Sequence, residues 1–129
     1  MDYRELYDIA LNASKNAYVP YSGFHVGAAV LTEDLKIYCG ANMENASYPV
    51  SLCAERTAMS KALYDGHRSF KAVAVAATKD GQEHSAAPCG MCRQFIFEFG
   101  DDIEIIFGEN RDSLKIFRIK DLLPEGFRL

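Results

Sequence analysis

Hydrophobic side chains near the start of the chain recur at the spacing of one face of a helix. This pattern predicts a helix over about residues 2–18, which Pro20 and Gly23 end. An almost unbroken apolar run then predicts a buried strand over residues 25–32. Alternating apolar positions over residues 36–41 predict its antiparallel partner after a short turn. The first third of the chain is therefore expected to form a helix followed by a β-hairpin.

The same two patterns continue through the rest of the chain. Helices are predicted over about residues 51–64, with Ser51 as the N-cap, and over residues 89–99. Residues 79–87 are predicted to form a polar loop. Strands and a last helical turn are predicted over residues 70–78, 103–107, 114–118 and 120–123. The order α-β-β-α-β-α-β-β predicts an α/β fold, a three-layer α/β/α sandwich around a five-stranded mixed sheet.

Composition and charge narrow the class of protein. The chain has 129 residues, 49% of them hydrophobic and 25% charged, which suits a single globular domain over residues 1–129. Its net charge is -4 and it has no basic run, which argues against nucleic acid as a partner. No apolar run is long enough to span a membrane, and the acidic, polar N-terminus does not resemble a signal peptide. We therefore expect a cytoplasmic protein whose four cysteines are reduced.

Three of the cysteines lie in two short segments, Cys53-Ala54-Glu55 and Pro88-Cys89-Gly90-Met91-Cys92. A structural zinc ion normally has four protein ligands, whereas a catalytic zinc ion has three and binds water at the fourth position. Both segments fall at predicted helix starts, where the helix dipole favours the thiolate form that binds metal. Glu55 follows the first cysteine closely enough to exchange protons with a bound water molecule. This pattern predicts one catalytic Zn²⁺ ion with these three cysteines as its ligands.

Two other arrangements of the cysteines remain open. Cys89 and Cys92 have the spacing of a redox pair with Cys53 unrelated, but this arrangement leaves Glu55 without a role. Alternatively, Cys39 turns off the apolar face of its strand and closes a structural site of four cysteines. A closed site of that kind would belong to a zinc-stabilised binding module without enzymatic activity. If neither holds, Cys39 is a small hydrophobic residue of its strand.

The predicted metal centre carries excess negative charge, because three thiolates outweigh the charge of one Zn²⁺ ion. Arg56 and Arg93 each lie close in sequence to a cysteine. Hydrogen bonds from such residues to the ligand sulfurs would offset the charge. Arg56 is the residue that we expect to act in this way.

These motifs resemble the signature of the zinc-dependent cytidine deaminases, in which a Cys-x-Glu segment precedes a Pro-Cys-x-x-Cys segment. The resemblance spans nearly the whole chain. Residues 18–29 are similar to the substrate-stacking segment of the small enzymes of this family, and residues 42–48 are similar to their ribose-binding loop. Further similarities lie at residues 53–58, 92–94 and 122–127. The resemblance implies a fold of the cytidine deaminase type.

The resemblance also implies roles for individual residues. Cys53, Cys89 and Cys92 match the zinc ligands, and Glu55 matches the proton shuttle. The implied substrate-binding residues are Asn42 and Glu44 for the ribose hydroxyls, Phe24 for the face of the pyrimidine, and the backbone of Ala54 for the carbonyl edge of the base.

An assembly and a reaction follow from the same resemblance. Tyr48 and Phe127 match positions that approach a neighbouring subunit's site in the short, homotetrameric enzymes, which carry one zinc ion per subunit. The implied reaction is hydrolytic deamination of cytidine and deoxycytidine to uridine and deoxyuridine, with release of ammonia, in pyrimidine salvage. Zinc activates water, and Glu55 carries protons to N3 and to the 4-amino group of cytosine. The implied partner is therefore a pyrimidine nucleoside.

Two related activities are left as alternatives. One is a deaminase of the same superfamily that acts on a nucleoside antibiotic such as blasticidin S, although Asn42, Glu44 and Phe127 favour ordinary nucleosides. The other is a deaminase that edits RNA or DNA, which the acidic balance of the chain opposes.

Overall fold

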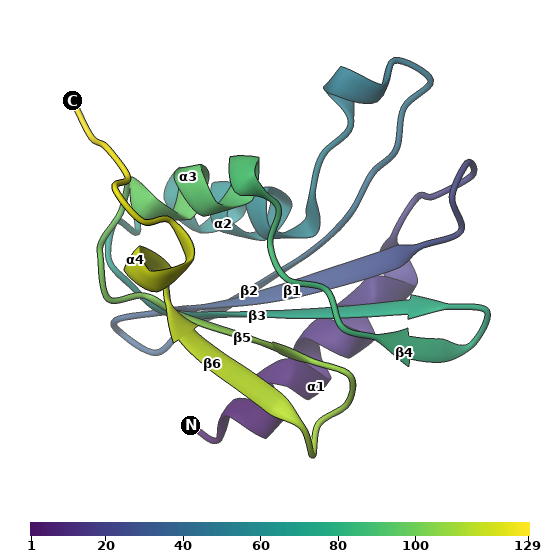
Figure 1. Ribbon diagram of the computed structural model, residues 1–129, viewed down its shortest axis with the longest axis horizontal. Helices are drawn as coiled ribbons and strands as arrows, with labels where there is room; N and C mark the ends of the chain where they lie inside the picture. The colour runs from purple at the N-terminus through teal and green to yellow at the C-terminus, as the bar shows by residue number, and fades with distance from the viewer.

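A mixed β-sheet separates two layers of helices in the computed structural model, which describes residues 1–129 (Figure 1). The strands are β1 (His25–Thr32), β2 (Ile37–Ala41), β3 (Phe70–Lys79), β4 (Gln82–His84), β5 (Glu104–Gly108) and β6 (Leu114–Arg118). The α-helices are α1 (Tyr3–Ala13), α2 (Ala54–Tyr64), α3 (Gly90–Phe97) and α4 (Ile119–Leu122). Two short 3₁₀ turns complete the chain, η1 (Ser14–Asn16) and η2 (Tyr48–Val50). The predicted α/β/α sandwich is confirmed.

The sheet has the strand order β2-β1-β3-β5-β6, and β4 pairs with β3 outside this path. β3 and β5 run parallel, joined by the crossover through α3, and the other neighbours are antiparallel. In the register, Ala28 of β1 lies opposite Gly40 of β2 and Val75 of β3. The sheet therefore has six strands, one more than the five predicted.

The additional strand corrects the prediction of a polar loop over residues 79–87. β3 turns into β4 at Asp80 and Gly81, both of which have positive φ angles, 53° and 77°. Asp-Gly is a favoured pair for a two-residue hairpin turn, because the two residues adopt these angles at low cost. The hairpin was thus visible in the sequence, although the strand it forms is only three exposed residues long.

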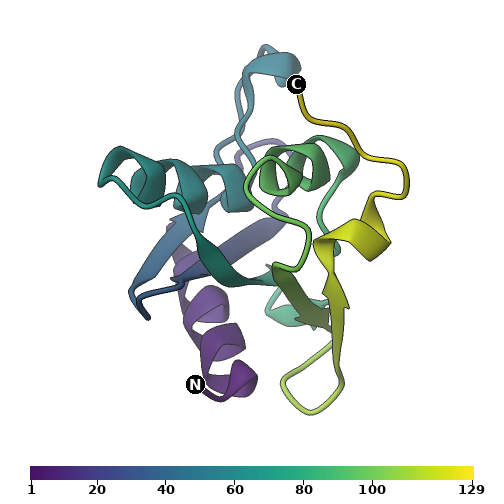
Figure 2. The same cartoon turned by 90° about the vertical axis from the view of Figure 1, so that its left-hand side faces the viewer.

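Helix α1 covers one face of the sheet (Figure 2). Its Leu6 and Tyr7 pack on strand residues that are mainly alanine. Alternate residues of β3 point to opposite faces, and Ala72, Ala74 and Ala76 point towards α1. The absence of a side chain at Gly27 allows the helix to lie close, since a Cβ atom there would meet the carbonyl oxygen of Ala10. Small residues on this face therefore set the distance between α1 and the sheet.

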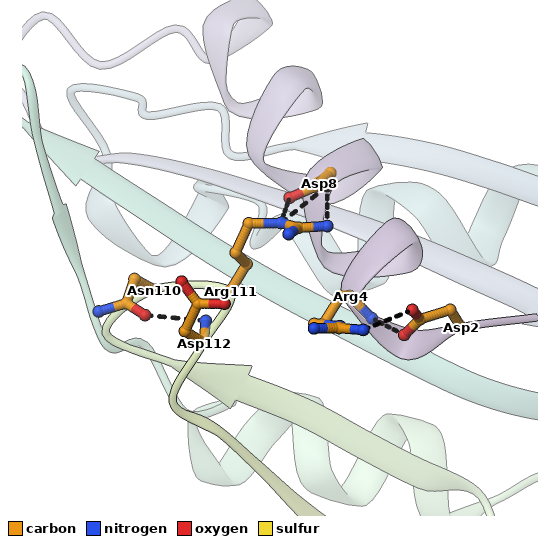
Figure 3. Close-up of polar contacts among 6 residues, drawn as sticks. All are labelled: Asp2, Arg4, Asp8, Asn110, Arg111 and Asp112. Carbon is orange, nitrogen blue, oxygen red and sulfur yellow. Dashed lines mark hydrogen bonds and ion pairs between the residues drawn. The ribbon is translucent and has the colours of Figure 1, made fainter.

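Polar contacts cap the start of α1 and attach its middle to the β5–β6 loop, as Figure 3 shows. The Asp2 carboxylate caps the helix by accepting a hydrogen bond from the Arg4 amide at 2.9 Å. Arg111, in the β5–β6 loop, reaches Asp8 with an N–O distance of 3.1 Å. These exposed contacts add little to stability individually, but they connect α1 to the far edge of the sheet.

Helices α2 and α3 lie side by side on the opposite face (Figures 1 and 2). Their core contains larger side chains, including Val73 and Val75 of β3 and Ile96 of α3. Gly40 of β2 lies directly beneath α2, where a Cβ atom would meet backbone atoms of Ala58. Packing against the sheet thereby fixes the position of both helices. No helix of the protein is both long enough and apolar enough to cross a bilayer.

The start of α2 differs from the prediction. Its N-cap is Cys53, two residues later than the expected Ser51. The Ser51 hydroxyl instead accepts a hydrogen bond from the Asn45 amide at 3.1 Å, within the loop that precedes the helix. The shift places the sulfur of Cys53 at the positive end of the helix dipole.

Candidate metal centre and active site

Three sulfur atoms converge where α2 and α3 begin. Cys53 and Cys89 are the N-caps of the two helices, and Cys92 lies in the first turn of α3. The three sulfurs lie within 4.8 Å of one another, and those of Cys53 and Cys89 are 3.9 Å apart. Cys39 is half-buried on β2 and does not belong to the cluster. The closed site of four cysteines is therefore ruled out in favour of three ligands.

The sulfur cluster has the dimensions of a zinc site. Tetrahedral zinc with Zn–S bonds of about 2.3 Å places two sulfurs about 3.8 Å apart. Hydrogen bonds with Cys92, Arg56 and Cys89 lower the pKa of Cys53 to about 5, so this sulfur is ready to bind as a thiolate. Contact with Cys53, together with burial, raises the pKa of Cys92. Because three adjacent thiolates repel one another, a divalent cation is the natural partner of the set.

Arg56 lies against the sulfur cluster, as predicted. One of its Nη atoms donates to the Cys53 sulfur at 3.6 Å and to the Ser51 carbonyl oxygen at 3.4 Å. Its buried Nε has no hydrogen-bond partner. The positive guanidinium group thus lies beside the negatively charged sulfurs. In this position it would offset the excess negative charge of a zinc ion bound by three thiolates.

Arg93, the other arginine close in sequence to a cysteine, hydrogen-bonds backbone carbonyl groups and no sulfur. Its Nε donates to the Pro88 carbonyl oxygen at 2.7 Å, and its Nη1 donates to the Leu122 carbonyl oxygen at 3.0 Å. Arg93 points away from the cluster because it follows Cys92 directly and leaves α3 on another side. It therefore braces the segment that precedes Cys89 against α4.

Glu55 is the one buried carboxylate of the protein, with 4% of its surface exposed. It lies in the first turn of α2, two residues after Cys53. Burial raises the pKa of Glu55 to about 6, and the charge of Cys53 acts in the same direction. A carboxyl group with this pKa can both accept and release a proton at neutral pH.

A cavity of about 540 Å³ opens in front of Glu55 and the sulfur cluster. Its volume is within the range of small-molecule sites, and most of its lining is apolar. Apart from the sulfurs, the lining includes Phe24, Asn42, Glu44, Tyr48, Ala54 and Glu55. Six of the residues singled out in the sequence therefore share one cavity with two of the cysteines.

The polar end of the cavity is built by Asn42 and Glu44. The Asn42 side-chain amide holds the start of β1, donating to the Phe24 carbonyl oxygen and accepting from the Val26 backbone amide, both at 2.9 Å. The Glu44 carboxylate accepts hydrogen bonds from the amides of Tyr21 and Ser22 at 3.0 and 3.1 Å. The Ser22 hydroxyl contributes most to lowering the pKa of Glu44, so this carboxylate is a fixed anion.

Aromatic rings border the same cavity. Phe24 packs against the His84 ring of β4 with centroids 6.0 Å apart. Tyr48, on η2, meets Tyr21 edge-to-face with centroids 6.2 Å apart. The β3–β4 hairpin thus supports Phe24, a contact that the loop predicted from the sequence did not anticipate.

Comparison with known proteins identifies the family. A family model described as "Cytidine and deoxycytidylate deaminase zinc-binding region" matches residues 1–109. A cytidine deaminase of Sporosarcina psychrophila is 45% identical over 128 residues, which are 98% of this chain and 92% of that protein. The chain belongs to the cytidine deaminase family. Zinc is accordingly the metal that the three cysteines fit.

Further comparisons agree along the whole chain. A probable cytidine deaminase of Dictyostelium discoideum is 45% identical over 93% of this chain and 80% of its own length. The crystal structure of a cytidine deaminase from Burkholderia pseudomallei superposes with a TM-score of 0.90 at 41% identity, covering 98% of this chain and 100% of that one. The cytidine deaminase fold predicted from the motifs is therefore confirmed.

Phe127 stands apart from the other predicted site residues of this family member. It does not line the cavity, and 65% of its surface is exposed. Figure 1 shows the C-terminus and the loop that carries η2 at opposite ends of the layer formed by α2 and α3. Within one copy of the chain, Phe127 and the cavity remain separate.

Several cavity residues escaped the sequence analysis. Val26 and Val75 form the floor from neighbouring strands, and Ala86 and Ala87 form a wall from the segment after β4. Apolar strand residues give no signal of a pocket, because the same pattern predicts any core. Ser22 could have been found, since it lies in the segment that resembles the substrate-stacking one.

Proposed function

We propose that this protein catalyses the zinc-dependent hydrolytic deamination of cytidine and deoxycytidine, with release of ammonia, in pyrimidine salvage. The observation that carries the proposal is one cavity lined by two of the three convergent cysteines, by a buried carboxylate and by an Asn–Glu pair. A flat base with an amino group fits the end of the cavity that holds the cysteines and Glu55. A sugar with hydroxyl groups fits the end formed by Asn42 and Glu44.

The proposed chemistry assigns a task to each end of the cavity. Cys53, Cys89 and Cys92 would hold zinc, which when bound makes water a better nucleophile at neutral pH. Glu55 would accept one proton of the water molecule and deliver it to N3, and would then carry the second, from the new hydroxyl group at C4, to the departing amino group. Its position at a helix start and its raised pKa support this role.

Substrate orientation would come from four further positions. Phe24 packs on the face of the pyrimidine, and the backbone of Ala54 binds the carbonyl edge of the base. Asn42 and Glu44 hydrogen-bond the sugar hydroxyls. Existing hydrogen bonds already hold both side chains in one orientation, so they lose little conformational freedom when the sugar binds.

The charge of the cavity favours a nucleoside over a nucleotide. Among the 17 lining residues there is no Lys or Arg, whereas Glu44 and Glu55 are both acidic. A phosphate on the substrate would therefore lose hydration without gaining a cationic partner.

Activity assays with purified protein test the proposal. We expect loss of cytidine absorbance together with ammonia release, abolition by a zinc chelator and recovery on zinc addition. Cytidine monophosphate and deoxycytidine monophosphate should be poor substrates, and blasticidin S serves as the third comparison. Absence of zinc-dependent ammonia release from either nucleoside would refute the proposal.

We further propose that residues 1–129 act as a single domain that assembles as a homotetramer in the cytoplasm. The separation of Phe127 from the cavity supports assembly, since Phe127 can complete a site only in a second copy. Large apolar side chains exposed around the site support it as well. They are Tyr48, Val50, Leu52 and Met91.

A further inference from the structure

Arg128 ties the segment after α4 to helix α3 through three contacts. Its Nε donates to the Phe97 carbonyl oxygen at 2.8 Å. Its Nη2 pairs with the Asp101 carboxylate. Its guanidinium carbon lies 4.0 Å from the centroid of the Phe97 ring, in a cation–π arrangement. Because the guanidinium group is planar, contacts with a carbonyl oxygen, a carboxylate and a ring at the same time hold it in one orientation.

Neighbouring contacts hold the backbone on the other side of Phe127. The Gln94 amide of α3 donates to the Phe127 carbonyl oxygen at 3.3 Å. Gly126 lies so close to Phe97 that a Cβ atom there would stand 3.0 Å from a ring carbon. Its amide donates to the Leu123 carbonyl oxygen at 3.1 Å. The backbone around Phe127 is thus attached to α3, while the side chain projects into solvent.

A backbone held on both sides displays one large apolar side chain to solvent at this point. Holding Phe127 in one direction reduces the ordering cost when its ring contacts another surface. Helix α3 also carries two of the three metal ligands in its first turn, so the tail is attached to the same rigid element as the metal centre.

We propose that Arg128 is a positioning residue that fixes the direction of Phe127 and thereby sets the affinity of a neighbouring subunit's site for its nucleoside. The inference rests on the proposed function, in which Phe127 reaches the site of a second copy. Arg128 itself touches neither the substrate nor the metal ligands.

The test measures kcat and KM for cytidine in Arg128→Ala, Arg128→Lys, Phe127→Ala and the double variant of both alanine substitutions. Arg128→Ala should raise KM about five-fold with kcat within about two-fold, the size expected for loss of a partly exposed cation–π and ion-pair clamp. Arg128→Lys should recover part of the loss, because a lysine keeps the charge but not the fork. Asp101→Asn should show a smaller effect in the same direction.

A thermodynamic cycle decides whether Arg128 acts through Phe127. In the Phe127→Ala background, Arg128→Ala should produce no further rise in KM. Arg118→Ala is the matched control, because Arg118 is a half-exposed arginine that pairs with Asp102 and Asp121, and it should leave KM unchanged. Oligomer mass and zinc content are measured for every variant.

Different outcomes overturn different statements. An unchanged KM in Arg128→Ala, or an additive rise in the double variant, would refute the positioning role while leaving the deaminase activity standing. A wild-type protein without cytidine deamination would refute the proposed function, and this inference with it. A normal KM in Phe127→Ala would refute the role of Phe127 in a neighbouring site and remove what Arg128 positions.

Discussion

Single residues of the site owe their chemistry to the helix starts at which they lie. Cys53 and Cys89 are N-caps whose side chains make no cap hydrogen bond to the helix, so their sulfurs remain available to a metal. Glu55 is buried by the helix that carries it, and burial raises its pKa to about 6. A cysteine or glutamate of the same type on the exposed face of α2 would have neither property.

Replacement of Glu55 by glutamine tests proton transfer directly. Glu55→Gln keeps the size of the side chain and the metal ligands, so zinc content by mass spectrometry should be unchanged. The value of kcat should fall by about 10²- to 10⁴-fold, the usual contribution of a positioned acid–base group. Near-normal turnover would contradict the assignment.

Arg56 gives a second test at this scale. Arg56→Gln removes the positive charge beside Cys53, and we expect zinc affinity or activity to fall by about 10- to 100-fold, as for other groups that support metal ligands. Arg56→Lys, which keeps the charge, should lie between. If Arg56→Gln retained both full zinc occupancy and wild-type turnover, Arg56 would have no such role.

Whole elements are placed by small residues and by long-range polar contacts. Gly40 allows β2 to lie directly against α2, and Gly27 allows β1 to lie directly against α1. Tyr3 and Tyr7 of α1 donate hydrogen bonds to Glu104 of β5 and Glu83 of β4, which joins the helix to two strands. The helix starts that hold the sulfurs therefore depend on packing several residues away.

Gly40→Ala should move α2 off the sheet. The added Cβ would meet backbone atoms, which cannot rotate aside, so the free energy of unfolding should fall by about 2 kcal/mol or more. Activity should fall as well, because Cys53 and Glu55 move with the helix. Denaturant unfolding measures the first effect, with Ser60→Ala on the exposed face of α2 as the control. Wild-type stability in Gly40→Ala would contradict the close approach.

The contact between Tyr3 and Glu104 predicts a loss of stability at high pH. Burial and this hydrogen bond raise the pKa of Tyr3 from 10.0 to about 12. A raised pKa in the folded state stabilises the protein fully below pH 10, and this stabilisation is lost as the pH rises from about 10 to about 12.

Tyr3→Phe provides the measurement for this effect. The difference in free energy of unfolding between wild type and Tyr3→Phe should therefore shrink as the pH rises above 10. Urea unfolding between pH 8 and pH 11.5 is compared with Tyr64→Phe, since the Tyr64 side chain is 92% exposed. A difference that stays constant over this range would show that the hydroxyl makes no such contact.

At the scale of the whole molecule, the homotetramer that we propose would bring Phe127 of one copy to the cavity of another. The cavity is lined by Cys53, Cys89, Glu55 and the Asn–Glu pair, but Phe127 lies outside it. The exposed apolar residues around the cavity give such an association a surface to bury.

Mixing two inactive or weakened subunits tests this arrangement. A Glu55→Gln subunit lacks its own proton shuttle but supplies Phe127, whereas a Phe127→Ala subunit keeps Glu55. Mixed oligomers, assayed below the wild-type KM for cytidine, should therefore exceed the weighted mean of the two parent activities. Activity equal to that mean would show that Phe127 does not act in a neighbouring site.

Much of the site was visible in the sequence because its chemistry lies in local motifs. Cys53 with Glu55, and Cys89 with Cys92, are close in sequence, so the members of each pair stay close in space in any fold. Asn42 and Glu44 belong to one short loop. The strand β4 and the N-cap of α2 were missed, because an exposed three-residue strand has no apolar pattern and several residues near Ser51 are acceptable caps.

The sequence by itself determined the order of helices and strands apart from β4, the association of three cysteines with a carboxylate, and the family to which these motifs point. Each rests on residue type and short spacing, which are local properties. Only the tertiary structure decided that Cys53 meets Cys89 across two helices, that Arg93 braces α4, and that Phe127 lies away from its own cavity. These depend on how distant segments pack against one sheet, and packing is a property of the folded chain as a whole.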